Sequence, residues 1–318
     1  MRGLLAAASP GNARGRLSVL IFHRVLAEPD ALFPDEIVAP RFDAICGWLR
    51  AWFDVLPLDA AARRLAAGTL PPRALAITFD DGYADNHDVA LPILQRHGLP
   101  ATFFIATGFL DGGRMWNDTL VEAFRGTRRS HLDLSDLLGA GHGHHALNTP
   151  AEKRCAIDAI IGMTMHRGSA QRDAVVLEIA ERCAAPLPTD LMLRSSQVRA
   201  LRDAGMQIGA HTVTHPILAG LDAATAREQM AASRRDLEAL LGERIGLFAY
   251  PSGKPGRDYS PESVALARQV GFEAAVSTAW GAAHRGTDPM QLPRFTPWDR
   301  SAWRFGARMA RNLWSSRR

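Results

Sequence analysis

The sequence predicts an α/β fold, and within that class a distorted (β/α) barrel of about seven parallel strands. Short apolar runs recur along the chain with helical patterns between them, which is typical of parallel strands joined by helices. Residues able to carry chemistry follow the ends of those runs, at the rim where such barrels place their active sites. The 318 residues, 47% of them hydrophobic, suffice for one enzyme-sized domain spanning 1–318.

The expected strands are residues 17–22, 74–79, 101–106, 207–210, 245–250 and 272–277, with a short seventh segment just before Arg294. Capping residues support the helices between them. Ser195 or Ser196 and Asp222 are typical helix N-caps, and Gly242 is a typical helix end. The alternation of strand and helix therefore continues through the second half of the chain.

A helical insertion, residues 112–200, is expected between the third and fourth strands. Apolar residues recur at helical spacing in 116–124, 151–165 and 173–183. The stretch 139–145 interrupts them with glycines and histidines. Because it contains no acidic residue, a flexible surface loop is favoured over a metal site.

Two adjacent aspartates follow the second apolar run. The segment Ile77-Thr78-Phe79 is strand-like and leads directly into Asp80, Asp81 and a glycine. Neighbouring side chains on an extended chain point to opposite sides, so one carboxylate can bind a metal while the other acts as a base. An ordinary surface turn is the alternative interpretation of this short pattern.

Two histidines, His211 and His215, follow the fourth run. Their i, i+4 spacing lets both imidazoles bind one ion if the chain turns helically there. Without such an ion they would form a solvated helix face. Two imidazoles and one carboxylate form a ligand set with open positions for water, which suits metal-assisted hydrolysis.

These two motifs resemble those of the NodB-type polysaccharide deacetylases, carbohydrate esterase family 4. Thr78-Phe79-Asp80-Asp81-Gly82 matches the family's first motif, and His211 to His215 matches its histidine-serine/threonine-x-x-histidine motif. The resemblance extends over most of residues 17–298. It includes an aromatic-Pro-x-Gly turn at 248–253, in which Ala249 stands where many relatives have arginine. The segments 22–25 and 292–295 are similar to a bacterial exopolysaccharide-associated branch.

The resemblance implies removal of N-acetyl groups from hexosamines of a bacterial surface polysaccharide or its precursor. Asp81, His211 and His215 would hold a divalent metal, with zinc favoured by the two imidazoles and other ions left open. Asp80 would be the catalytic base. Since Ala249 replaces the usual arginine, Arg294 is the expected substitute that holds Asp80.

The remaining roles rest on position along the chain. The general acid is expected to be His23, at the end of the first strand, in preference to His284. A backbone N–H near Tyr250 and Pro251 is expected to stabilise the oxyanion together with the metal. Trp116, and with it Trp48, are candidates for stacking on sugar rings, although single tryptophans are more often core residues.

Two other functions stay open at this point. The same barrel and metal set could hydrolyse a small amide that is not a glycan, or the protein could be a glycan-binding barrel that does no catalysis. A retaining glycosidase is poorly supported, because its two carboxylates must lie about 5 Å apart across the bond. The prominent pair in this chain is adjacent in sequence.

Composition constrains partners and compartment. The formal charge of +4 is spread along the chain and requires no nucleic acid. The region 299–318 is the concentrated basic segment, and it is expected to be a helix that either packs on the barrel or contacts an anionic membrane surface. The chain has three cysteines without close spacing and no long apolar run, and these features favour a cytoplasmic protein. If the basic segment contacts a membrane, the protein is expected to be peripheral to the inner membrane.

Overall fold

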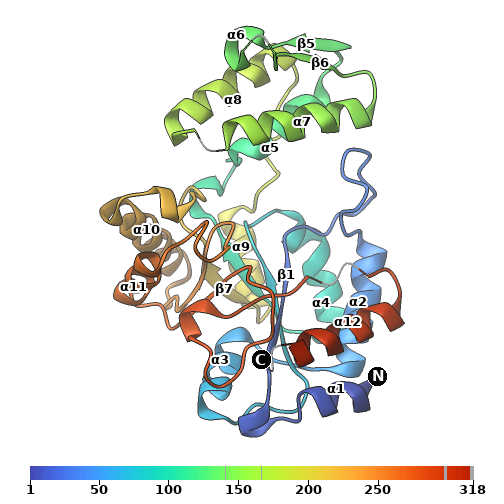
Figure 1. The fold of residues 1–318 in the computed structure, drawn as a ribbon, viewed down its shortest axis with the longest axis vertical. Coiled ribbons are helices and arrows are strands. Elements are labelled where there is room, and N and C mark those ends of the chain that lie inside the picture. Colours follow the sequence, from blue (N-terminus) through green and yellow to red (C-terminus); the bar gives the residue numbers. More distant parts are fainter. Residues whose placement is uncertain (140, 166, 297–298, 316–318) are drawn as a thin grey trace. The chain divides into compact units, whose positions relative to one another are not determined.

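The computed structural model describes residues 1–139, 141–165, 167–296 and 299–315. The chain divides into two compact units (Figure 1). The first consists of Met1–Ala27, Ile37–Leu110 and Leu193–Arg318, and the second of Glu28–Glu36 and Asp111–Met192. The first unit carries the barrel, and the second corresponds to the expected insertion.

The barrel sheet is entirely parallel. Its strands lie in the order β1 (Ser18–Phe22), β3 (Ala74–Phe79), β4 (Thr102–Ile105), β7 (Gln207–Ala210), β8 (Leu247–Ala249) and β9 (Ala274–Val276). All residues of β1, β3 and β4 are buried, as expected for strands covered on both faces. All six expected strands before the seventh segment are confirmed. The two-residue strand β2 (Asp54–Val55), which pairs with the start of β3, was not predicted.

The segment around Arg294 joins the two outer strands. Leu292 bridges to Val276 in β9, and Phe295 bridges to Leu20 in β1. The Phe295 N–H donates to the Val19 carbonyl at 2.8 Å. Pro293 lies between the two bridges and has no N–H to donate, so the segment forms isolated bridges instead of the regular seventh strand that the sequence predicts.

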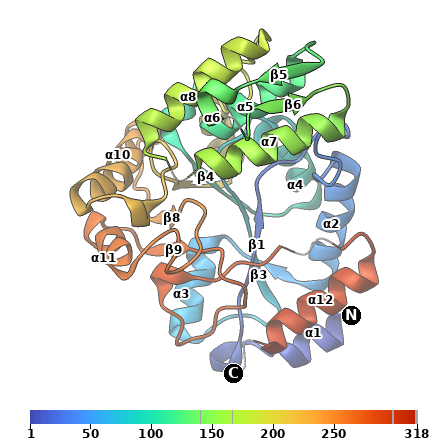
Figure 2. The ribbon, with the colours of Figure 1, turned by 45° about the horizontal axis from the view of Figure 1, so that its top comes forward.

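Helices surround this sheet in both views (Figures 1 and 2). They are α1 (Arg2–Ala8), α2 (Ala39–Trp52), α3 (Leu58–Ala67), α4 (Leu91–His97), α9 (Ser195–Asp203), α10 (Ala223–Leu241), α11 (Pro261–Val270) and α12 (Ala302–Ser315). Short helical turns occupy Asn12–Arg14 (η1), Asn86–Ala90 (η2), Thr107–Phe109 (η3), Leu218–Gly220 (η4) and Pro289–Gln291 (η5).

The helix caps test the predicted boundaries. Asp222 caps α10 by accepting from the Thr225 N–H, and Gly242 ends that helix at φ 68°, as predicted. In α9 the expectation was wrong by one position. Ser195 is the first helical residue, and Arg194 precedes it at the cap, where its own N–H donates to the Gln197 side chain at 2.9 Å.

The second unit has a core of its own, formed largely by helices. These are α5 (Trp116–Gly126), α6 (Ser135–Leu138), α7 (Pro150–Thr164) and α8 (Ser169–Cys183). Buried side chains such as Leu120, Ile157 and Ile179 pack together in it. The segment Glu28–Glu36 belongs to this unit, because both carboxylate oxygens of Asp30 accept from Arg125 at 2.7 Å. The expected insertion extended too far, because α9 begins inside its bounds but belongs to the first unit, which resumes at Leu193.

The glycine- and histidine-rich stretch is not simply the flexible loop that the sequence suggests. Part of it forms β6 (His144–Ala146), which pairs with β5 (His131–Asp133) as an antiparallel hairpin. Residue 140 lies outside the described residues, as do 316–318 of the predicted basic segment. Within the described chain, no helix combines the length and the apolar character needed to cross a bilayer.

Candidate active site

The expected site residues of the barrel gather at the carboxyl ends of its strands. Asp80 and Asp81 follow β3, His211 follows β7, and Tyr250 follows β8. The parallel register aligns these ends, since Phe22 lies opposite Phe79 and Ile105 opposite Ala210. One rim of the barrel therefore presents most of the side chains that the sequence singled out.

Three of these side chains converge as a metal-ligand set. One ligand atom from each of Asp81, His211 and His215 lies within 4.8 Å of the others. The Nε2 atoms of His211 and His215 lie 3.3 and 3.4 Å from the same oxygen, Oδ1 of Asp81. Two nitrogens and one oxygen directed at a common point are a donor set that suits zinc and similar divalent ions.

A carbonyl group fixes the tautomer of His211. Its Nδ1 lies 2.8 Å from the Ala249 carbonyl oxygen. Because a carbonyl oxygen only accepts hydrogen bonds, Nδ1 carries a proton, and Nε2 is therefore the nitrogen that the neutral imidazole would offer to a metal ion. The position where many relatives have an arginine side chain thus contributes its backbone to the orientation of a ligand.

Electrostatics prepare the same set for a cation. Burial alone would raise the pKa of Asp81, but a hydrogen bond with His211 and the charge of His215 hold that pKa well below its usual range. Burial lowers the pKa of His215 to about 4, outweighing the opposite effect of Asp81, so this imidazole is neutral at neutral pH. Burial would also lower the pKa of His211, but Asp81 and Asp80 raise it instead.

The Asp80 carboxylate makes a different contact, with Arg294. Arg294 donates from Nη1 and Nη2 to the two oxygens of Asp80, each at 2.6 Å, in a bidentate pair that is almost fully buried. The guanidinium is itself held by the Ser277 carbonyl at 2.9 Å and by Thr78 Oγ1 at 3.2 Å. Burial opposes ionisation of Asp80, but Arg294 and then His211 outweigh it and hold the pKa of Asp80 below its ordinary value.

The rim loops that carry these residues have strained backbones. Asp81, Thr212 and His215 have φ values of 78°, 64° and 53°, which are uncommon for residues other than glycine and especially so for β-branched threonine. The helical turn proposed between the two histidines is wrong, because residues 211–217 form an irregular loop. In that loop the Thr212 hydroxyl accepts from the His215 N–H at 3.0 Å and holds the turn.

Residues that the sequence analysis missed hold the histidine loop from outside. Gln229 of α10 accepts from the N–H groups of Val213 and Thr214 through one side-chain oxygen, at 3.1 and 3.0 Å. Gly108 donates its N–H to the Val213 carbonyl at 2.9 Å. A Cβ atom on Gly108 would lie 2.8 Å from that oxygen, so the close approach requires glycine. A glycine two residues after an expected strand was the available signal.

His23 lies at the same rim and is exposed. The Asp80 N–H donates to the carbonyl of Phe22, the residue before His23, at 3.0 Å, so the His23 loop starts beside the first motif. The His23 carbonyl accepts from Asn86 Nδ2 at 2.8 Å, and Asp85 accepts from the N–H of Val25 at 3.1 Å. Asp85 and Asn86, close behind the first motif, therefore fix the loop of His23, although the sequence analysis did not select them.

The expected oxyanion donor needs correction. The Tyr250 N–H already donates to the Val276 carbonyl at 3.2 Å, and Pro251 has no N–H. Ser252 comes next and has φ 56°, in the left-handed region. Among the hydrogen bonds of the described residues its N–H has no acceptor, which makes it the better candidate donor near Tyr250.

Other aromatic and histidine candidates lie elsewhere. Trp48 packs against Trp52 and Phe305, so it serves the core and not a sugar ring. Trp116 lies in the second unit, where the Arg172 guanidinium covers its ring at 4.8 Å, and its sugar stacking stays a prediction. His284 follows Ala283, which bridges to Leu17 at the amino end of the first strand, so it is remote from the rim.

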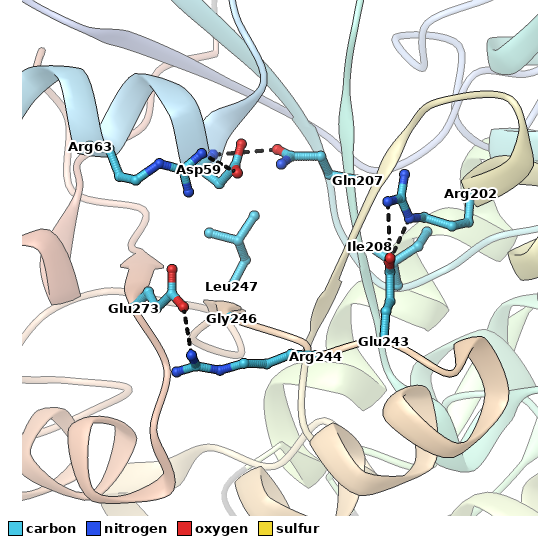
Figure 3. Close-up of a pocket in the computed structure, with 10 residues that line it drawn as sticks. All are labelled: Asp59, Arg63, Arg202, Gln207, Ile208, Glu243, Arg244, Gly246, Leu247 and Glu273. Atoms are coloured by element: carbon cyan, nitrogen blue, oxygen red, sulfur yellow. Dashed lines mark hydrogen bonds and ion pairs between the residues drawn. The ribbon is translucent and has the colours of Figure 1, made fainter.

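A cavity of about 300 Å³ lies at the other end of the strands (Figure 3). Its lining includes Gln207 at the start of β7 and Gly246 just before β8. Its charged groups pair with one another: Arg63 with Asp59, Arg202 with Glu243, and Arg244 with Glu273. Three cations neutralised by three anions leave no unbalanced charge for a ligand, so this cavity is not the candidate active site.

A parallel barrel with a carboxylate and two imidazoles at its carboxyl rim defines a hydrolase-type site. The sequence profile of polysaccharide deacetylases matches residues 67–138 and 161–275 of this chain. That match covers more than half of the chain, which therefore belongs to the polysaccharide deacetylase family and is a deacetylase, a hydrolase acting on a bacterial glycan.

Individual relatives are distant in sequence. The Bacillus subtilis (strain 168) protein YxkH, itself provisionally assigned as a polysaccharide deacetylase, is 21% identical over 281 residues, covering 88% of this chain and 70% of YxkH. The Streptococcus pyogenes deacetylase PplD, solved in complex with acetate, shares 19% identity with a TM-score of 0.61 over 92% of this chain and 98% of its own. IcaB from Ammonifex degensii has the same identity and TM-score over 96% and 98%. These likenesses establish the barrel fold.

Proposed function

We propose that the protein removes N-acetyl groups from hexosamine residues of a bacterial surface polysaccharide or its precursor. The observation that carries this proposal is the division of labour between adjacent carboxylates: Asp81 faces two imidazoles, while Asp80 is held separately by Arg294. The family membership supports a glycan substrate. A solved relative from Aggregatibacter actinomycetemcomitans, described as a de-N-acetylase, supports the N-acetyl group as the point of attack.

Asp81, His211 and His215 would hold a divalent ion, for which zinc is the first candidate. Such an ion, when bound, lowers the pKa of water and polarises an acetamide carbonyl. The protein's own part is to aim the three ligands at one point and to keep Asp81 and His215 unprotonated, which their depressed pKa values do. The Nδ1–H of His211 orients its Nε2 towards that point, and because Asp81 and Asp80 raise the pKa of His211, the ion would compete with a proton for that nitrogen.

Asp80 would accept a proton from the attacking water. Its two oxygens each accept one bond from Arg294, but each carboxylate oxygen has a second lone pair, so acceptor capacity remains. Arg294 keeps the carboxylate ionised in a buried setting and fixes its orientation. In this proposal Arg294 is a positioning residue that takes over the role expected of the arginine absent at Ala249.

Two groups would complete the reaction at the rim. The Ser252 N–H would donate to the oxyanion that forms when water adds to the acetamide carbonyl. His23, exposed at the same rim, would protonate the departing amine. Acetate and a free amino sugar are the products.

Acetate release from N-acetylglucosamine oligomers by zinc-loaded protein tests the proposal. We expect release that stops on addition of a chelator and returns with the metal. A protein that releases acetate from a small N-acetylated amine but not from the oligomers would contradict the glycan assignment. Absence of release from both, with the metal bound, would favour the glycan-binding alternative over catalysis.

A further inference from the structure

The last helix, α12, packs on the barrel through one side only. Phe305, Met309 and Leu313 are fully buried there. Phe305 contacts Trp48 and Trp52 in the last turns of α2. This packing accounts for one face of the helix and agrees with the packed-helix alternative for the basic segment, but it leaves the opposite face in solvent.

The solvent face of α12 combines large aromatic rings with arginines. Trp303 is 72% exposed and Trp314 is 39% exposed. The two lie eleven positions apart, close to three helical turns, and therefore project on the same side. Arg304, Arg308 and Arg311 are exposed next to this tryptophan edge. Residues 302–315 include no acidic residue that would offset the charges of these arginines.

A loop beside α12 carries a further exposed tryptophan. Trp280 is 68% exposed, and its ring lies in a T-shaped arrangement with that of Phe295. The loop is tied to the helix, because Asn312 donates to the carbonyl of Gly281 at 3.2 Å. Three of the five exposed large hydrophobic side chains found in the described residues are thus tryptophans on or beside α12.

The charges of this face are incompletely neutralised. Arg308 pairs with Asp299 at 2.5 Å. Arg304 and Arg311 take part in no ion pair found among the described residues. Uncompensated guanidinium groups beside exposed indoles match the two layers of a membrane interface, anionic headgroups and the acyl boundary, where tryptophan is enriched.

We propose that α12 and Trp280 form a docking surface for an anionic lipid bilayer, with the indoles entering the interface and the arginines contacting lipid phosphates. This inference goes beyond the proposed function and does not depend on it. The helix α2 runs from the carboxyl rim towards the amino ends of the strands, and its last turns contact α12. The proposed surface therefore lies away from the rim, and docking would leave the candidate active site uncovered. Both views place α12 beside α1, near the two termini (Figures 1 and 2).

Cosedimentation of the full chain with phosphatidylcholine vesicles, with and without phosphatidylglycerol, tests the surface. We expect binding to the anionic vesicles only, weakened by salt, together with a blue shift of tryptophan emission. Reversing two charges with Arg304→Glu and Arg311→Glu should weaken binding at least about tenfold, because each arginine near an anionic surface contributes roughly a fivefold factor. Trp303→Ala with Trp280→Ala should reduce binding and remove most of the blue shift.

The matched control is Arg227→Glu with Arg235→Glu on α10. Both arginines are exposed, and the double change lowers the net charge from +4 to 0, the same change as in the α12 variant. Binding retained by the control and lost by the α12 variant supports the surface. Equal loss in both, or no binding by the unchanged protein at low ionic strength, contradicts it. Association that depends on protein concentration in analytical ultracentrifugation, and is abolished by the tryptophan changes, would assign the face to a second copy instead.

Discussion

The two ends of the barrel treat charge in opposite ways. At the amino end, three arginines pair with three carboxylates around the cavity of Figure 3, and those charges cancel locally. At the carboxyl end, Asp81 faces two imidazoles without a fixed cation of the protein, while Arg294 is committed to Asp80. The number of charged groups therefore does not identify an active site. What identifies it is a set of donors directed at one point.

The loops that carry the candidate site are strained, although strain is not confined to that end, since Arg73, directly before β3, has φ 59°. Asp81, Thr212, His215 and Ser252 hold left-handed conformations in loops at the carboxyl rim. Such conformations cost on the order of 1–3 kcal/mol each, and they persist where surrounding contacts enforce them. Gln229 and Gly108 supply contacts of this kind for the histidine loop. Changes at the rim should therefore affect activity strongly, and changes at the amino end should affect it little.

Among substitutions that keep the proposed metal ligands and the proposed base, Arg294→Met should have the largest effect on activity and stability. Burial then dominates at Asp80, so its pKa rises and the acidic limb of the kcat/KM profile moves to higher pH. A buried carboxylate without its partner also destabilises the fold by about 3–5 kcal/mol. A pH–rate profile and a denaturant titration measure the two effects.

Arg294→Lys is the control for that change. Lysine keeps a positive charge but cannot make the bidentate contact, so the acidic limb should shift less than in the methionine variant while kcat still falls. The stability linkage has the matching sign. Since the pKa of Asp80 is depressed in the fold, its contribution is present above the unfolded pKa and is lost as pH falls through the folded value. An unchanged acidic limb in both variants would contradict the role of Arg294.

Gly108→Ala should have an intermediate effect. The new Cβ would lie 2.8 Å from the Val213 carbonyl, so the histidine loop must shift. Metal affinity should fall about tenfold or more, as expected when a group that supports metal ligands is disturbed. Gly47→Ala is the matched control, because its Cβ would make only an ordinary contact at 3.7 Å in α2. Competition with a chromogenic chelator measures the zinc affinity. If Gly108→Ala and Gly47→Ala both bound zinc as tightly as the unchanged protein, the proposed role of Gly108 would be wrong.

Glu243→Gln at the amino end should have the smallest effect. The change breaks the ion pair between Glu243 and Arg202. Both side chains of this pair are more than a third exposed, so the free energy of unfolding should change by less than about 1 kcal/mol. Activity should not change. Thermal unfolding and an acetate-release assay measure the two quantities. A large fall in activity in a normally folded variant would contradict the proposed difference between the two ends of the barrel.

The sequence predicted the strands that are continuous apolar runs, such as residues 74–79, because burial on both faces leaves a clear local signal. It did not predict β2 or the β5–β6 hairpin. These strands are two and three residues long and carry exposed side chains, so their pairing depends on partners distant in sequence. The regular seventh strand failed for a local reason, the proline between Leu292 and Arg294.

For the site, adjacency in the motif and position at a strand end were enough to select Asp80, Asp81 and the two histidines. Selecting Arg294 required the additional observation that an expected arginine was missing at Ala249. Tertiary contacts such as the Gln229 bond to the histidine loop leave no periodic signal in the sequence. The helical turn between the histidines was wrong because spacing alone does not reveal the left-handed backbone of Thr212 and His215.

The most direct test compares Asp80→Asn with Asp81→Asn, measuring both bound zinc and acetate released from N-acetylglucosamine oligomers. Asp80→Asn should keep its zinc and lose activity about 10²–10⁴-fold, as expected for removal of a catalytic base. Asp81→Asn should lose zinc affinity and activity together. If both variants lost zinc equally, or if Asp80→Asn remained active, the proposed division between a ligand and a base at adjacent positions would be wrong.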